Sequence, residues 1–201
     1  MRAEAVAALV GTIVEAGVNL PGVNGEAATA ARFAGQRTER RGSAAFPVEG
    51  QRIYELARVP QGTPAGGRMR QASLDDLVLA WTRGFLADMG QDARDLEPVV
   101  ERRLDDGDFW LWEGGPTSMA AISEPVEGVV RMQFVYTPPE RRNRGYNRGY
   151  AEACVADLSR RMQEAGHRCI LYTDLGNPTS NSVYRRIGYR TLAEGLRYRF
   201  E

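Results

Sequence analysis

The most informative segment of the sequence is Phe134-Val135-Tyr136-Thr137-Pro138-Pro139-Glu140-Arg141-Arg142-Asn143-Arg144-Gly145-Tyr146. It predicts a strand that ends at the proline pair, because proline offers no N–H to a strand ladder. The Arg- and Gly-rich loop leads into a predicted helix at 148–164. Gly145 lets backbone N–H groups approach a ligand, and a helix N-terminus carries about half a positive charge. The stretch therefore predicts a cradle for an anion such as a pyrophosphate.

Two further properties of this stretch favour an extended ligand that carries phosphates. Four arginines, Arg141, Arg142, Arg144 and Arg148, can donate charge-assisted hydrogen bonds. Each such bond contributes about 1.5–3 kcal/mol where it is desolvated. The proline pair also frees the backbone of residues 135–137 from strand pairing, so that it can hydrogen-bond a ligand that contains amides.

A second patterned region lies downstream, at residues 171–189. It predicts a strand that ends in Leu171-Tyr172-Thr173-Asp174, followed by the turn Asn177-Pro178-Thr179-Ser180-Asn181. A helix is predicted at 180–186. Its second half begins the sequence Tyr184-Arg185-Arg186-Ile187-Gly188-Tyr189. A closing strand is predicted at 192–200.

Together the two regions resemble the GNAT superfamily of N-acetyltransferases, whose acetyl-CoA loop has the signature Arg/Gln-x-x-Gly-x-Gly/Ala. Arg142 and Gly145 match the Arg and the first Gly of that signature. The order of strand, Asn177, helix and Tyr-x-x-x-Gly-Tyr is similar to the closing elements of the family. The resemblance covers about residues 68–201. It implies an α/β (α+β) fold of the GNAT type, with a mixed, mostly antiparallel sheet flanked by helices.

The resemblance also implies an activity: an N-acetyltransferase that takes acetyl-CoA as acyl donor and moves the acetyl group directly to a primary amine. It gives Tyr184 the role of the general acid that protonates the departing thiolate, and it puts Asn177 and Ser180 near the pantetheine or the thioester. The other donor-binding residues that it implies are Val135, Tyr136 and Thr137 for the pantetheine arm and Arg141, Arg142, Asn143, Arg144, Gly145, Tyr146, Asn147 and Arg148 for the pyrophosphate.

The loop departs from the family signature at one place. Residues Asn143–Tyr146 are repeated at once as Asn147–Tyr150, so that Asn147 stands where the signature has Gly or Ala. A four-residue insertion is close to one helical turn of about 3.6 residues, which keeps the buried face of the helix in register. The alternative function is a CoA-binding pseudoenzyme or binding protein of GNAT fold that this duplication has impaired.

The first 59 residues resemble the back half of the same unit. The segments Ala3–Gly17 and Ala151–Gly166 both end in Glu-Ala-Gly, and each precedes a strand, an Asn, a helix and closing strands. We therefore expect a partial, degenerate GNAT-like half-unit at 1–59, a Pro- and Gly-rich linker at 60–67 and a complete domain at 68–201. Two ordinary amphipathic helices with similar C-caps are the alternative explanation.

The composition excludes several kinds of chemistry. The 201 residues carry 26 Lys and Arg and 26 Asp and Glu side chains, and all 26 of the former are Arg. Without Lys, Schiff-base chemistry and a Walker A loop are excluded. A single His, His167, and two Cys are too few for a zinc site, so we expect no metal. The net charge of zero gives no general attraction to nucleic acid, although Arg-Gly-Tyr repeats also occur in RNA-binding segments.

The remaining expectations concern location and partners. No apolar run approaches the roughly 20 residues of a membrane helix, and the N-terminus lacks a signal-peptide pattern, so we expect a cytoplasmic protein that does not bind membranes. The expected acceptor is a small molecule or peptide with a primary amine. The N-terminal segment could shape the acceptor cleft or the surface of a homodimer. Glu124, Glu127 and Asp174 are candidates for a general base, beside deprotonation of the amine through water.

Overall fold

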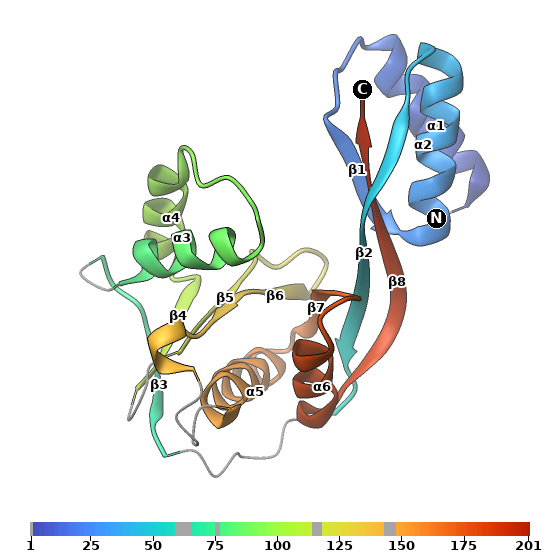
Figure 1. Cartoon of the computed structure of the whole chain (residues 1–201). Coiled ribbons are helices and arrows are strands. Elements are labelled where there is room, and N and C mark those ends of the chain that lie inside the picture. The colour runs from blue at the N-terminus through green and yellow to red at the C-terminus, as the bar shows by residue number, and fades with distance from the viewer. Residues whose placement is uncertain (1, 59–65, 75–76, 114–117, 143–147) are drawn as a thin grey trace. The chain divides into compact units, whose positions relative to one another are not determined.

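The computed structural model describes residues 2–58, 66–74, 77–113, 118–142 and 148–201 (Figure 1). Its contacts divide the chain into two units. The first comprises Met1–Tyr54, Tyr172–Asn181 and Thr191–Glu201, and the second comprises Glu55–Leu171 and Ser182–Arg190. Most of the expected linker at 60–67 lies outside the described residues, so the domain boundary placed there stays a prediction.

The second unit contains the strand and the proline pair at residues 134–139. Its strands are β3 (Arg68–Gln71), β4 (Phe109–Glu113), β5 (Ser118–Ile122), β6 (Val129–Tyr136) and the first part of β7 (Arg168–Asp174). They lie side by side in the order β7-β6-β5-β4-β3. β6 runs parallel to β7, whereas the other neighbours are antiparallel. The sheet is therefore mixed and mostly antiparallel, which confirms the predicted fold class.

Helices cover both sides of these strands. Figure 1 shows α3 (Val78–Asp88) and α4 (Leu96–Asp105) on one side of β4–β6 and α5 (Arg148–Glu164) on the other. A short 3₁₀ turn, η1 (Pro139–Arg141), follows β6, and α6 (Pro178–Ile187) follows β7. An apolar core fills the space between α3, α4 and the strands, and its buried members are Val78, Trp81, Val100, Phe109, Leu111, Met119, Ala121 and Tyr136.

The first unit is built from the two ends of the chain together with the segment Tyr172–Asn181. It contains α1 (Ala3–Glu15), β1 (Gly22–Glu26), α2 (Ala27–Arg41) and most of β2 (Ala45–Leu56) and β8 (Tyr189–Phe200), with the strand order β1-β8-β2. β1 pairs antiparallel with β8, from Gly22↔Arg199 to Glu26↔Gly195. The helix-strand-helix-strand order of 3–56 recurs in 148–200, as a partial repeat would require. The repeat itself stays a prediction.

The end of β6 is fixed by a close approach of Tyr136 to α3. A Cβ atom added to Gly84 in the middle of α3 would lie 2.5 Å from Tyr136 Oη and 3.0 Å from its Cζ. The Tyr136 ring also meets the ring of Phe85 edge-on, with centroids 6.4 Å apart. Only a glycine at position 84 leaves room for the Tyr136 side chain in this position.

Replacing Gly84 by Ala is therefore expected to destabilise the protein by about 1–3 kcal/mol of overpacking, less the gain in helix propensity. The matched control is Gly35→Ala in α2, where an added Cβ has no neighbouring atom within 4 Å. That substitution is expected to stabilise by about 0.5–1 kcal/mol, because alanine restricts the unfolded chain. Chemical denaturation of both variants measures the difference. Equal stabilities would show that Tyr136 can move aside without cost.

Candidate active site

A β-bulge interrupts β6 shortly before its end. Met119 of β5 pairs with Tyr136, and Ala121 pairs with Gln133, so β6 has one more residue than β5 over this interval. Phe134 lies within it with a φ of +48°, in the left-handed region that non-glycine residues seldom occupy. Bulges leave an extra residue unpaired and concentrate next to active sites. The bulge thus bends β6 at the residues expected to receive the pantetheine arm, Val135–Thr137.

Thr137, the first residue after β6, is held by both of its oxygen atoms. Its hydroxyl lies 2.7 Å from the buried Ser118 hydroxyl, and its carbonyl accepts a hydrogen bond of 2.6 Å from Arg142 Nε. The two oxygen contacts hold Thr137 in place at the end of β6, and its role in binding the pantetheine arm stays a prediction.

The Arg142 side chain folds back onto α3 and β6. Its Nη2 lies 2.5 Å from Asp88 Oδ2, at the last residue of α3, and its guanidinium carbon lies 5.1 Å from the centre of the Tyr136 ring. Burial and the nearby Asp88 carboxylate raise the pKa of the Tyr136 phenol. No sequence pattern pointed to Asp88, which is 54 positions away from Arg142.

The remainder of the anion loop falls largely outside the described residues. Asn143, Arg144, Gly145, Tyr146 and Asn147 are not among them, so their roles stay predictions. Arg148, Gly149 and Tyr150, the rest of the duplicated four residues, form the first turn of α5. This placement agrees with an insertion of about one helical turn. Arg141 lies in η1, where its N–H donates to the carbonyl of Pro138.

The start of α6 is capped by one of the predicted site residues. Asn177 Oδ1 accepts a hydrogen bond of 3.0 Å from the N–H of Ser180, as an N-cap side chain does. The contact expected between Asn177 and the pantetheine or the thioester stays a prediction. Ser180 lies in the first turn of α6 and is half-buried.

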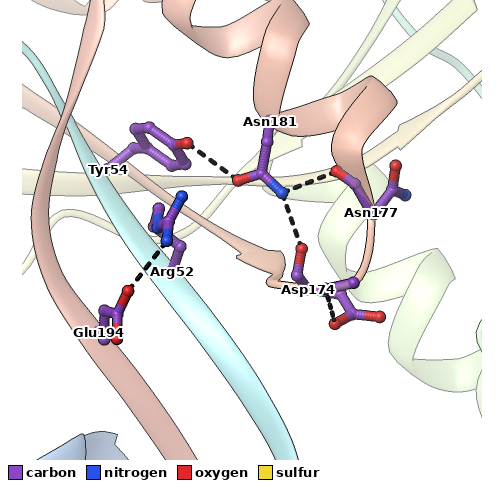
Figure 2. Close-up of polar contacts among 7 residues, drawn as sticks. Arg52, Tyr54, Asp174, Asn177, Asn181 and Glu194 are labelled. Carbon is purple, nitrogen blue, oxygen red and sulfur yellow. Dashed lines mark hydrogen bonds and ion pairs between the residues drawn. The ribbon is translucent and has the colours of Figure 1, made fainter.

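A buried polar network next to this cap was missed by the sequence analysis. Figure 2 shows Asn181 between Tyr54 of β2 and the turn that joins β7 to α6. The hydroxyl of Tyr54 donates to Asn181 Oδ1 over 2.9 Å. On the same strand, Arg52 forms an ion pair of 2.9 Å with Glu194 of β8. The one available signal was the spacing of four residues between Asn177 and Asn181, which places both amides on one face of a helix.

Tyr184 lies in the second half of α6. It is half-buried, and its ring meets the ring of Tyr189 edge-on with centroids 6.1 Å apart. The hydroxyl of Tyr189 in turn lies 2.7 Å from Ser159 Oγ of α5. Burial raises the pKa of Tyr184 to about 12, so the phenol keeps its proton at neutral pH. A phenol that stays protonated is available to donate a proton, which is the role expected for Tyr184.

The three candidate bases are all exposed. Glu124 lies three residues before the turn that leads into β6, and Glu127 lies within that turn with a φ of +50°. Asp174 Oδ1 accepts a hydrogen bond of 2.8 Å from the N–H of Gly176, which commits one carboxylate oxygen to the turn before α6. None of these contacts marks one carboxylate as a base, so the choice among them stays open.

Comparison with known proteins identifies the fold. Residues 111–198 match the family model described as FR47-like protein, which is related to the GNAT superfamily. Comparison with curated proteins gives no match. Among solved structures, an acetyltransferase from the GNAT family of Colwellia psychrerythraea is similar with a TM-score of 0.64 at 12% identity, over 99% of this chain and 72% of that one.

Two further structures support the same fold. The GCN5-related N-acetyltransferase from Kribbella flavida has a TM-score of 0.59 at 18% identity, over 99% of this chain and 76% of that one. The one from Sphaerobacter thermophilus has a TM-score of 0.60 at 15% identity, over 89% of this chain and 59% of that one. The chain thus spans only part of the length of these proteins. It has the GNAT fold, and the resemblance seen in the sequence is confirmed at that level.

No group of three or more His, Cys, Asp or Glu side chains is placed to bind a metal ion within the described part of the chain. Among the helices of that part, none combines the length and apolar character needed to span a membrane.

Proposed function

We propose that the protein is an N-acyltransferase that transfers an acetyl group from acetyl-CoA to a primary amine. The observation that carries this proposal is the bulged end of β6, which leads through the turn at 137–142 to the N-terminus of α5. A bulged strand end, an arginine-rich turn and a helix that begins at Arg148 follow one another in this part of the chain, a combination that suits an amide-containing arm joined to a pyrophosphate. The GNAT fold supports the same ligand class.

The chemistry asks three things of this chain. The bulged strand and the start of α5 bind the donor and aim its thioester. The amine nitrogen then bonds to the carbonyl carbon while the carbon–sulfur bond breaks, and Tyr184 Oη gives its proton to the departing thiolate sulfur. Water takes the surplus proton from the new amide nitrogen and reprotonates Tyr184. A positioned acid of this kind contributes about 10²–10⁴-fold to the rate.

Calorimetric titration of the whole chain with acetyl-CoA tests the proposal directly. We expect micromolar binding, and release of the CoA thiol when a primary amine is added. The control is a variant that lacks residues 147–150, which restores the family spacing of the loop. Binding by that variant alone would show that the duplication has disabled the donor site and would favour the pseudoenzyme instead. Absence of binding by both proteins would contradict the acyltransferase.

A further inference from the structure

The bulge in β6 changes the face of the sheet on which the Phe134 side chain lies. Ala121 of β5 belongs to the core under α3 and α4 and pairs with Gln133, so Gln133 lies on the same face. In a regular strand the next residue, Phe134, would lie on the opposite face. Phe134 instead packs against the core under α3 and α4, and its φ is +48°. The position of its ring and the bulge therefore depend on each other.

The Phe134 ring is held by side chains from three elements. Phe85 of α3 meets it edge-on, with ring centroids 5.4 Å apart, and Phe109 of β4 lies beside it at 5.7 Å. The guanidinium of Arg103 in α4 lies over it, with the central carbon 5.2 Å from the ring centre. A residue in a sparsely populated backbone region stays there only when its surroundings fix it at several points. The three contacts provide such points.

Arg103 is fixed in this position by the rest of its guanidinium. Nε donates to Asp108 Oδ2 over 2.8 Å, and Nη2 donates to the carbonyl of Ile122 over 2.7 Å. The side chains of Arg103 and Asp108 are 14% and 16% exposed, so their ion pair is largely shielded from solvent. The guanidinium carbon also lies 5.3 Å from the centre of the Phe109 ring. Arg103 thus joins the last turn of α4 to both rings beside the bulge.

We propose that Arg103 is a positioning residue for the acyl donor, which holds Phe134 and thereby the bulge that precedes the pantetheine-binding residues 135–137. The inference rests on the acyltransferase function proposed above. Because the charge of Arg103 is paired with Asp108, it acts on the donor through Phe134 and not as a further cation for the phosphates. Arg103, Phe134 and residues 135–137 all belong to the second unit.

The test is a calorimetric titration of the full chain with CoA, in the wild type and in Arg103→Met. Methionine removes the cation and keeps an unbranched apolar side chain, so the bulged conformation becomes less populated. The apparent Kd rises in proportion as the binding-competent conformation becomes rarer, and saturating ligand restores that conformation. We therefore expect Arg103→Met to raise the Kd for CoA about fivefold or more, with an unchanged binding stoichiometry.

The matched control is Arg161→Met in α5. Arg161 also forms an ion pair, with Asp157 over 2.8 Å, and its guanidinium carbon lies 5.4 Å from the ring of Trp110. The control therefore loses the same charge and the same two kinds of contact, but on a ring other than Phe134. We expect its Kd for CoA to stay within about twofold of the wild type, because exposed ion pairs contribute little.

The decisive result comes from a double-mutant cycle with Phe134→Leu, which removes the ring and keeps an apolar side chain. If Arg103 acts through Phe134, Arg103→Met causes no further rise of the Kd in the Phe134→Leu background. Additive rises would overturn the proposal, as would a wild-type Kd for Arg103→Met or an equal rise for Arg161→Met. A lower stoichiometry at wild-type Kd would also overturn it, because it would indicate partial unfolding instead of a shifted bulge.

The same titrations separate this inference from the acyltransferase function. A wild-type chain that does not bind CoA would overturn both, whereas wild-type binding with an unchanged Kd in Arg103→Met would overturn the inference alone. Should Arg103→Met fail to fold, Arg103→Lys replaces it in the same cycle. An ammonium keeps the ion pair with Asp108 but lacks the planar group that lies over the two rings, so the same rise of the Kd is expected.

Discussion

Tyr184→Phe is expected to lower kcat about 10²–10⁴-fold, because it removes the proton that the thiolate needs. The ring and its edge-on contact with Tyr189 remain, so we expect the affinity for CoA to stay near its wild-type value, and the thermal stability is measured on the same variant. Steady-state kinetics and calorimetry on the same preparation measure both quantities.

The pH dependence provides an independent check on Tyr184. Because burial raises its pKa to about 12, the phenol stays protonated through neutral and mildly alkaline pH. A decline of kcat through loss of this proton is therefore expected only as the pH approaches 12. An unchanged kcat in Tyr184→Phe would show instead that water protonates the thiolate, and it would remove Tyr184 from the mechanism.

Arg142→Ala is expected to weaken CoA binding at least about tenfold, since charge-assisted hydrogen bonds contribute about 1.5–3 kcal/mol each. Two effects combine in this loss. The alanine cannot donate to the Thr137 carbonyl, so the turn after β6 loses the hydrogen bond that holds it. The substitution also removes one positive charge at the start of the loop. Calorimetric titration with CoA measures the change in the dissociation constant.

Asp88→Asn separates the two effects. An asparagine still accepts a hydrogen bond from Arg142 but removes a negative charge from the neighbourhood of the donor site, so we expect the affinity for CoA to stay within about threefold of the wild type. A loss as large as that of Arg142→Ala would mean that Arg142 acts through its ion pair with Asp88. The role of Arg142 in holding the pyrophosphate would then be contradicted.

The local parts of the fold were predictable from sequence. The predicted helix at 148–164 is α5 to the residue, and the proline pair ends β6 as expected. Periodicity, caps and prolines act over a few positions, and the sequence displays them directly. The hairpin strands at 109–113 and 118–122 follow from the same kind of signal, and they pair antiparallel as expected.

The long-range contacts of the site were not predictable in this way. Tyr54 and Asn181 are 127 positions apart, and neither position shows a pattern that names the other. Asp88 is the last residue of α3, and no sequence motif links it to Arg142. The bulge at Phe134 gave no signal because a phenylalanine in a strand is ordinary, whereas its positive φ is not. Such features arise when separate elements pack, and one sequence does not encode them as local patterns.

The pairing of β1 with β8 has a consequence for how the chain is made. Gly22 faces Arg199, so β1 leaves the ribosome long before its partner strand exists. At about 5–20 residues per second, synthesis of the intervening chain takes on the order of ten seconds or longer. During that time the edge of β1 and the apolar faces of α1 and α2 lack their partner strand β8, while strands β3–β6 can already pair. The first unit to be synthesised is thus the last to be completed, and a chain stopped before β8 leaves it exposed to aggregation and proteolysis.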